Sequence, residues 1–322
     1  MNKVQPRWTG LVQILLIIIQ SLFLPSATVI EAAEPPITSI TFTSDGKSVL
    51  AASQAGVNIY DWPNLKRRGK LEFAFANIHD IQFSPDAQRL AIAGGNPGET
   101  GVVNVFGWQS RDTISALRQH QDSVYSIAWM NDNRRIVSVS LDRQVLLYHD
   151  SSERKVQKFA GHSKGVTAVC LLKDDTILVT AGIDQSLRVW DVSTGKMIRT
   201  LNNHTAPIHD LQYRPNHDGL PMVASISDDR TLRFWQPTIG RMVRFVKLDS
   251  IPLAVVWHPQ KPIVATTTSM GNIAIVDAET AEILKQIKTN QKWIYALVVS
   301  PDGKWIVTQG EDGLQRHPFL EE

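Results

Sequence analysis

The sequence predicts an all-β fold, a seven-bladed β-propeller of four-stranded antiparallel blades, and three observations lead to it. A short extended motif of alternating apolar residues recurs at spacings of 41 to 46 residues, which is the length of one four-stranded blade. A cluster of turn residues follows each copy, as in a hairpin. No segment shows a sustained apolar period of 3.6 residues, so we expect strands throughout. The seven copies of the motif end at Phe42, Phe83, Trp129, Leu171, Tyr213, Trp257 and Val299.

Each strand of a blade can be recognised in the fourth copy. Its first strand ends at Leu171, and the turn cluster Lys173-Asp174-Asp175 follows. Residues 177–180 form a small and β-branched run, which is the predicted second strand with a tightly packed face. Residues 187–191 and the more charged residues 196–201 are the predicted third and fourth strands. The other copies repeat this order with variations in loop length.

The N-terminal residues have the order of a secretory signal peptide. Lys3 and Arg7 precede an apolar stretch, residues 11–24, which Pro25 ends, and small residues follow. Fourteen residues in a helix cover about 21 Å, which is short of the roughly 30 Å hydrocarbon core of a bilayer. A cleaved signal therefore fits the segment better than an uncleaved membrane anchor.

We expect residues 1–32 to be removed as this signal, with cleavage near Ala32. Residues 33–322 then form a single propeller domain with no stable membrane span. The predicted location is outside the cytoplasm, in a periplasm or in the secreted fraction.

Composition narrows the possible partners. The chain carries 33 basic and 31 acidic side chains, a formal net charge of +2, which is too little for a surface that neutralises many phosphates. Nucleic acid is therefore not an expected partner. The single cysteine, Cys170, excludes an intramolecular disulfide and a thiolate metal cluster. We expect no cofactor.

Copies three to five carry a histidine, a serine or threonine, an aspartate and an aromatic residue at similar spacing. With these residues the chain resembles the WD40-repeat family over about residues 37–317. The resemblance implies that each set forms one buried hydrogen-bonded chain in its blade. The sets are His120, Ser138, Asp142 and Tyr148 in copy three, His162, Thr180, Asp184 and Trp190 in copy four, and His204, Ser225, Asp229 and Trp235 in copy five.

The remaining copies depart from this pattern. Met270 stands at the position of the turn aspartate in copy six, and Pro318 stands at the position of the tryptophan in copy seven. We expect copies one, two, six and seven to be held by packing alone. Copy seven also supplies only three strands. The resemblance implies closure by an N-terminal strand, and residues 27–33 are the candidate. Because they overlap the cleavage region, we expect an open three-stranded blade in the mature protein.

Two motifs imitate catalytic sites. Residues 161–165 match the G-x-S-x-G pattern of a serine hydrolase, but a strand follows them where that site needs a helix. Residues 94–101 are glycine-rich but lack the lysine of a phosphate-binding loop. Both are better interpreted as loops of the repeat.

The pairs His79-Asp80 and His209-Asp210 precede two first-strand motifs and suggest metal ligands. They belong to copies two and five of the ring, so we expect them on nearly opposite sides of the channel, too far apart for bonds of about 2.1 Å to one ion. No metal site is predicted.

One face of the ring, which we call the upper face, is formed by the loops entering the first strands and by the turns between second and third strands. It is predicted to gather aromatic and polar residues, which are common anchors of protein interfaces. The candidate partner-binding residues are His79, Tyr125, His209, Asp228, Trp293, Tyr295 and Glu311.

These observations predict an extracytoplasmic, non-catalytic scaffold that binds a protein or peptide through the upper face. The alternative is a propeller enzyme or small-molecule binder with a site at the central channel, which needs titratable groups that converge near the axis. A third possibility is a structural subunit of a larger envelope assembly. The fold alone does not choose among them.

Overall fold

The computed structural model describes residues 35–71, 77–149, 152–310 and 313–320. The predicted signal peptide, the candidate closing strand at residues 27–33 and the candidate residue Glu311 lie outside these residues. The described chain consists of strands and turns, as the alternating apolar pattern predicts. No helix in it is long and apolar enough to cross a lipid bilayer.

The strands form six four-stranded antiparallel sheets and one three-stranded sheet, each built from consecutive strands. The first strands of the seven blades are β1 (Ile37–Phe42), β5 (Ile78–Phe83), β9 (Val124–Trp129), β13 (Val166–Leu171), β17 (Ile208–Tyr213), β21 (Pro252–Trp257) and β25 (Leu297–Val299). The second strands are β2 (Ser48–Ser53), β6 (Arg89–Asn96), β10 (Arg135–Ser140), β14 (Ile177–Gly182), β18 (Val223–Ser227), β22 (Ile263–Thr268) and β26 (Trp305–Gly310).

The third strands are β3 (Gly56–Asp61), β7 (Thr100–Gly107), β11 (Val145–His149), β15 (Leu187–Asp191), β19 (Thr231–Gln236), β23 (Asn272–Asp277) and β27 (Gly313–Pro318). The fourth strands are β4 (Arg67–Leu71), β8 (Thr113–His120), β12 (Ser152–Phe159), β16 (Met197–Leu201), β20 (Arg241–Lys247) and β24 (Ile283–Lys288). The seventh blade ends with β27 in the described chain, so the prediction of seven blades with a three-stranded last one is confirmed.

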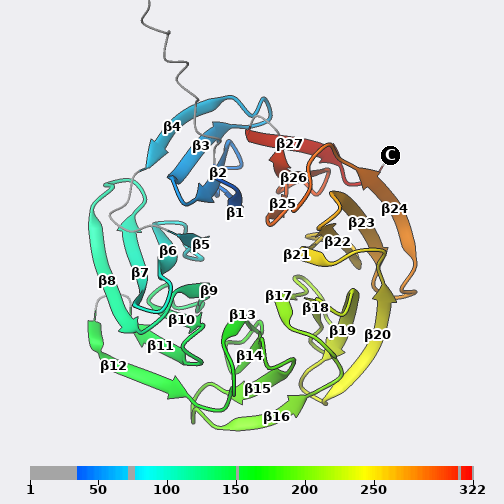
Figure 1. Ribbon diagram of the computed structural model, residues 1–322. Coiled ribbons are helices and arrows are strands. Elements are labelled where there is room, and N and C mark those ends of the chain that lie inside the picture. Colours follow the sequence, from blue (N-terminus) through cyan, green and yellow to red (C-terminus); the bar gives the residue numbers. More distant parts are fainter. Residues whose placement is uncertain (1–34, 72–76, 150–151, 311–312, 321–322) are drawn as a thin grey trace, which may run out of the picture. The chain divides into compact units, whose positions relative to one another are not determined.

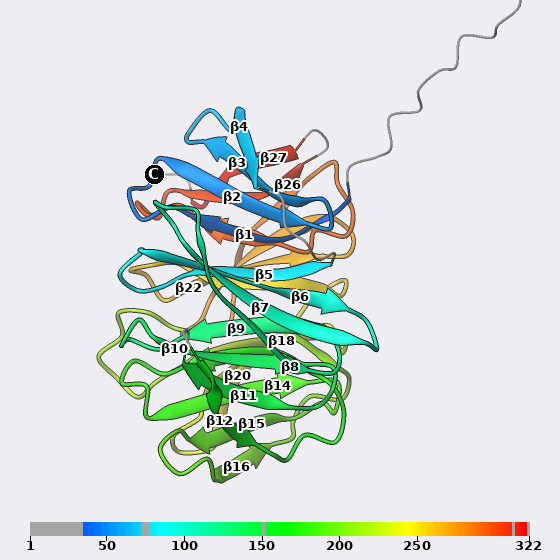
Figure 2. The ribbon, with the colours of Figure 1, turned by 90° about the vertical axis from the view of Figure 1, so that its left-hand side faces the viewer.

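The blades form a ring with their first strands at the centre and their fourth strands at the rim (Figure 1). First strands of neighbouring blades contact one another around the whole ring, and β25 contacts β1 where the last blade meets the first. The side view shows the same junction, with β26 and β27 beside β3 (Figure 2). The ring therefore closes by side-chain packing between the first and last blades.

The core lies between neighbouring sheets. One cluster joins Ile37, Val49 and Tyr60 of the first blade to Ala296 and Val307 of the last, and all five are buried. Equivalent clusters fill the other junctions. Both faces of each second strand are covered by neighbouring sheets. Small and β-branched residues on these strands therefore allow the sheets to pack closely.

Candidate functional site

A cavity of about 530 Å³ lies at the centre of the ring, and residues from every blade line it. Along six of the first strands, one residue near the start interrupts the regular pairing with the second strand. Such a bulge re-aims a side chain. The interrupting residues are Thr38, His79, Tyr125, Thr167, His209 and Leu253. All six line the cavity, as does Tyr295, which precedes β25 in the last blade.

Two pairs of stacked rings lie at the upper face. His79 stacks on Tyr125 with 4.2 Å between ring centroids. Trp293 stacks on Tyr295 with 6.3 Å between centroids, and these side chains are 50% and 40% exposed. Tyr295 also lines the cavity, so the second pair extends from the channel mouth outward.

Met270 extends this exposed apolar surface onto the neighbouring blade. The amide of Trp293 donates a hydrogen bond of 3.1 Å to the carbonyl of Ser269, which places the two loops against each other. Met270 is 59% exposed, the largest value among the exposed apolar side chains of the described chain. We name Met270, Trp293 and Tyr295 the apolar patch. Exposed apolar side chains gathered at one place commonly mark an interaction site.

The two histidines proposed for the upper face differ in environment. Burial lowers the pKa of His79 to about 4, and its Nε2 is buried with no hydrogen-bond partner among the described residues. His209 is partly exposed, and its Nε2 lies 2.6 Å from Oδ1 of Asp228. Both rings line the same cavity, but the described chain holds no group of three acidic, histidine or cysteine side chains that fits a metal ion.

Asp80 and Asp210 line the cavity immediately after these histidines. From the sequence they are either metal ligands or ordinary polar residues at the rim. Burial raises the pKa of Asp80 to about 6, and the negative charge of Asp210 raises it as well. Burial also raises the pKa of Asp210. Two carboxylates that face one low-dielectric space disfavour each other's ionisation.

Both aspartates connect neighbouring blades. Asp80 accepts hydrogen bonds from the amide of Ile127 at 3.0 Å and from the hydroxyl of Ser39 at 3.2 Å, in the blades on either side. Asp210 accepts one from the amide of Val255 at 3.0 Å. Near each, a tryptophan of the next blade donates to the carbonyl of a glutamine two residues after the aspartate, Trp129 to Gln82 and Trp257 to Gln212. The repeated Asp-x-Gln of these two first strands is the sequence feature that could have indicated this shared arrangement.

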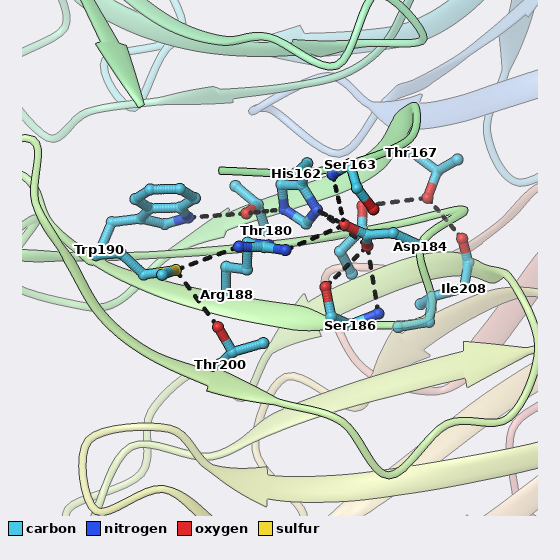
Figure 3. A network of polar contacts seen from close by, with 12 residues as sticks. His162, Ser163, Thr167, Thr180, Asp184, Ser186, Arg188, Trp190, Thr200 and Ile208 are labelled. Carbon is cyan, nitrogen blue, oxygen red and sulfur yellow. Dashed lines mark hydrogen bonds and ion pairs between the residues drawn. The ribbon is translucent and has the colours of Figure 1, made fainter. Parts of the chain in front are cut away.

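In blades three to five, the polar residues that the family resemblance singled out lie in hydrogen-bonded chains. In blade four, Trp190 Nε1 donates to Thr180 Oγ1 at 2.8 Å, and Thr180 Oγ1 lies 2.8 Å from His162 Nε2. His162 Nδ1 lies 3.0 Å from Asp184 Oδ2 (Figure 3). A neutral imidazole accepts a hydrogen bond from the threonine hydroxyl at one ring nitrogen and donates one to the aspartate from the other. Every hydrogen bond of the chain then runs in the same direction, from the tryptophan to the aspartate.

Blades five and three repeat the arrangement. Trp235 donates to Ser225 at 2.8 Å, Ser225 lies 2.7 Å from His204, and His204 lies 2.8 Å from Asp229. In blade three, the hydroxyl of Tyr148 takes the place of the indole. It contacts Ser138, which lies 2.7 Å from His120, and His120 lies 2.9 Å from Asp142. The tyrosine hydroxyl therefore substitutes for the tryptophan N–H.

The charges in these chains are set by opposing effects. Burial disfavours the carboxylate of Asp184, but the hydrogen bond and charge of His162 together with the hydrogen bonds from Ser186 and Ser163 outweigh it and hold the pKa of Asp184 well below its usual range. Burial lowers the pKa of His204 to about 4, although Asp229 opposes the change. His204 is thus neutral at pH 7, as the direction of the chain requires.

Two expectations about the divergent blades are wrong. In blade seven, His317 rather than Pro318 occupies the position of the tryptophan, since His317 pairs with Ile306 as Trp190 pairs with Leu178. The reason is that the hairpin between β26 and β27 is one residue shorter than the hairpin between β14 and β15 of blade four. His317 Nε2 lies 3.3 Å from Thr308 Oγ1.

The divergent blades are also not held by packing alone. In blade one, Thr43 Oγ1 donates to Asp45 at 2.6 Å across the hairpin turn, and in blade two Ser84 does the same to Asp86 at 2.5 Å. Asp80 adds hydrogen bonds from blade two to both neighbours. The sequence pattern did not predict these hydrogen bonds, because bonds within turns and between blades do not follow the residue spacing of the histidine chains.

Comparison with known proteins identifies the repeats. The family model described as WD domain, G-beta repeat matches residues 111–149, 153–191, 195–236 and 281–314. The chain is 30% identical over 286 residues to the nuclear distribution protein nudF of Aspergillus niger, which covers 81% of this chain and 63% of that protein.

Two further relatives are more distant. The nuclear distribution protein PAC1 of Arthroderma otae is 24% identical over 207 residues, which cover 61% of this chain and 44% of that protein. THO complex subunit 3 of Arabidopsis thaliana is 22% identical over 200 residues, 61% of this chain and 62% of that protein. The chain thus spans less than two thirds of the length of these relatives.

Proposed function

Because the chain is a WD40-repeat β-propeller protein, we propose that it is a non-catalytic scaffold that binds a protein or peptide through its upper face, outside the cytoplasm. The observation that carries the proposal is the stacked and exposed pair of Trp293 and Tyr295 beside the channel mouth. A rigid aromatic pair in this position loses little conformational entropy on binding and offers a large contact area.

The surroundings of this pair fit an interface. Met270 widens the apolar area, while His209 and Asp228 supply a polar edge across the cavity. An apolar centre with a polar rim is the usual composition of a protein interface. One of the similar proteins is named as a subunit of a complex, which is in keeping with a binding role.

The location outside the cytoplasm rests on the sequence of residues 1–32, with its basic start, its short apolar stretch and the small residues that follow. Fractionation of the source cells, together with N-terminal sequencing of the purified protein, tests it. A chain that starts near Ala33 in the exported fraction supports the proposal, and an intact Met1 in the cytoplasmic fraction overturns it.

The binding function is tested with a triple variant, Tyr125→Ala, Trp293→Ala and Tyr295→Ala. We expect it to fold normally and to lose the partners that crosslink to and co-purify with the wild type. The matched control is Phe245→Ala, which removes an exposed aromatic ring from β20 at the rim. Retention of every wild-type partner by the triple variant removes the upper face from consideration.

A second function, an enzyme or small-molecule site at the central channel, is favoured by one observation. The cavity of about 530 Å³ has the size of a small-ligand site, and it contains a carboxyl group, Asp80, whose pKa is about 6. Native mass spectrometry of the purified protein separates the two functions. A bound small molecule without a protein partner supports this second function.

A further inference from the structure

Two acids line the cavity, and His209 offsets the charge of one of them in part, since it lowers the pKa of Asp210 although burial raises it more. The cavity lining includes the acids Asp80 and Asp210 and the histidines His79 and His209, besides Cys170 and three tyrosines. No lysine or arginine of the described residues is among the lining residues. The cations of the upper loops and turns, Arg143, Lys164, Arg230 and Lys292, are not part of the lining. An ion pair that forms inside such a cavity is more favourable in free energy than an ion pair at an exposed surface, because water screens the charges less.

The hydrogen bonds of the two aspartates come from neutral groups. Asp80 accepts from Ile127, Ser126, Ser39 and Gln82, and Asp210 accepts from Val255 and Leu211. These bonds orient the carboxylates, but they do not neutralise them. Full compensation of both acids therefore requires positive charge from outside the cavity lining.

The apolar patch adjoins the same opening. Tyr295 belongs both to the cavity lining and to the stack with Trp293, so an extended segment crossing the mouth meets an apolar surface and a negative cavity side by side. This combination selects a partner by charge as well as by apolar contact.

We propose that the channel mouth binds a segment of a partner protein that inserts a lysine or arginine side chain toward Asp80 and Asp210 and places an apolar side chain on Trp293 and Tyr295. The inference rests on the proposed function and names the class of segment that the upper face takes. A long basic side chain suits this place, because its aliphatic stem passes the aromatic rim while its charged end reaches the acids.

The experiment is a selection of random linear peptides displayed on phage against the wild-type chain. We expect the selected peptides to share a lysine or arginine close to an aliphatic or aromatic residue. Each selected peptide is then synthesised with that basic residue replaced by leucine. Its affinity should fall by about tenfold or more, because the carboxylates lose their counter-charge.

The matching protein variant is Asp80→Asn with Asp210→Asn, which keeps side-chain size and removes the negative charge, although one acceptor oxygen of each carboxylate becomes an amide donor. It should lower the affinity for the basic peptides by a similar factor, about tenfold or more. The control Asp302→Asn, in a turn outside the cavity lining, should leave the affinity unchanged. Unchanged binding of the basic peptides by the double variant overturns the inference.

A second variant leaves both aspartates intact. Leu253 lines the cavity at a bulge position, so Leu253→Lys places an intramolecular ammonium at the mouth and should compete with the peptide, while Leu253→Met should not. This pair keeps the test valid if the asparagine variants fold poorly.

The outcomes also separate the inference from the proposed function. Peptides that lack a basic residue, yet lose binding in the triple aromatic variant, overturn the inference and leave the upper face as the binding surface. A library that yields no binder to the wild type counts against both.

Discussion

Blades four and seven have a buried threonine at the same place of the second strand but complete its hydrogen bonding differently. In blade four, Thr180 joins a tryptophan of the third strand to His162 of the loop above it. In blade seven, Thr308 Oγ1 lies 3.3 Å from Nε2 of His317 on the third strand and donates to the carbonyl of its neighbour Gln309. The blade-four chain therefore ties an upper loop to the centre of its sheet, and blade seven has no such tie in the described residues.

The consequence is seen at the upper face. The loop of blade four is held by Asp184, which accepts a hydrogen bond of 3.0 Å from the amide of Ser163. The corresponding loop before β25 carries Trp293 and Tyr295, both exposed and stacked on each other. The comparison teaches that the histidine chains stabilise the ring where they occur, while blade seven, which lacks one, presents the exposed aromatic pair.

The largest expected effect contrasts the two third-strand residues. Trp190→Ala removes a fully buried indole and the donor to Thr180, so the free energy of unfolding should fall by about 3–5 kcal/mol. His317→Ala removes a smaller, partly exposed ring and should cost about 1 kcal/mol or less. Urea denaturation of both variants measures the difference. Equal losses would show that the blade-four chain is no stronger than the contact in blade seven.

The aspartates that end the chains come next. Asp184→Ala and Asp229→Ala should each lower the free energy of unfolding by about 1–3 kcal/mol, because a buried histidine loses its acceptor. Asp45→Ala, in an exposed hairpin turn, should cost far less. Thermal denaturation midpoints check this. Identical midpoints for the three variants would contradict the role of the chains.

The smallest effect concerns pH. The pKa of His204 is about 4 in the folded chain against an ordinary value of 6.5, so below pH 6.5 the unfolded state binds a proton that the folded state does not. Stability from this group is present above pH 6.5 and falls as the pH approaches 4. Between about pH 7.5 and about pH 5 the loss should be roughly 1–2 kcal/mol.

The variant His204→Gln isolates this contribution. Asp80 acts in the opposite direction, because its raised pKa of about 6 favours the folded state as the pH falls from 6 toward 3.8. Chemical denaturation of wild type and variant at both pH values shows how much unfolding free energy each protein loses on acidification. A wild type that loses no more stability than His204→Gln on acidification contradicts a neutral His204 in the folded chain.

The sequence predicted much of the site because its signals are local. Strand alternation and turn residues place one residue of each copy at the start of the first strand, and in six blades that residue is the bulge that faces the cavity. The family resemblance supplied the histidine chains by position. Pro318 was assigned wrongly because a count along the chain does not show that the last hairpin is one residue shorter.

The sequence by itself thus determined the seven repeats, the three-stranded last blade and the residues that surround the channel mouth, because periodicity and turn chemistry act within a few residues. Only the tertiary structure decided that Asp80 and Asp210 share one buried space and that Met270 joins Trp293 in the apolar patch. Both arrangements bring together residues of different blades. They depend on burial and on distances between sheets, which no local pattern records.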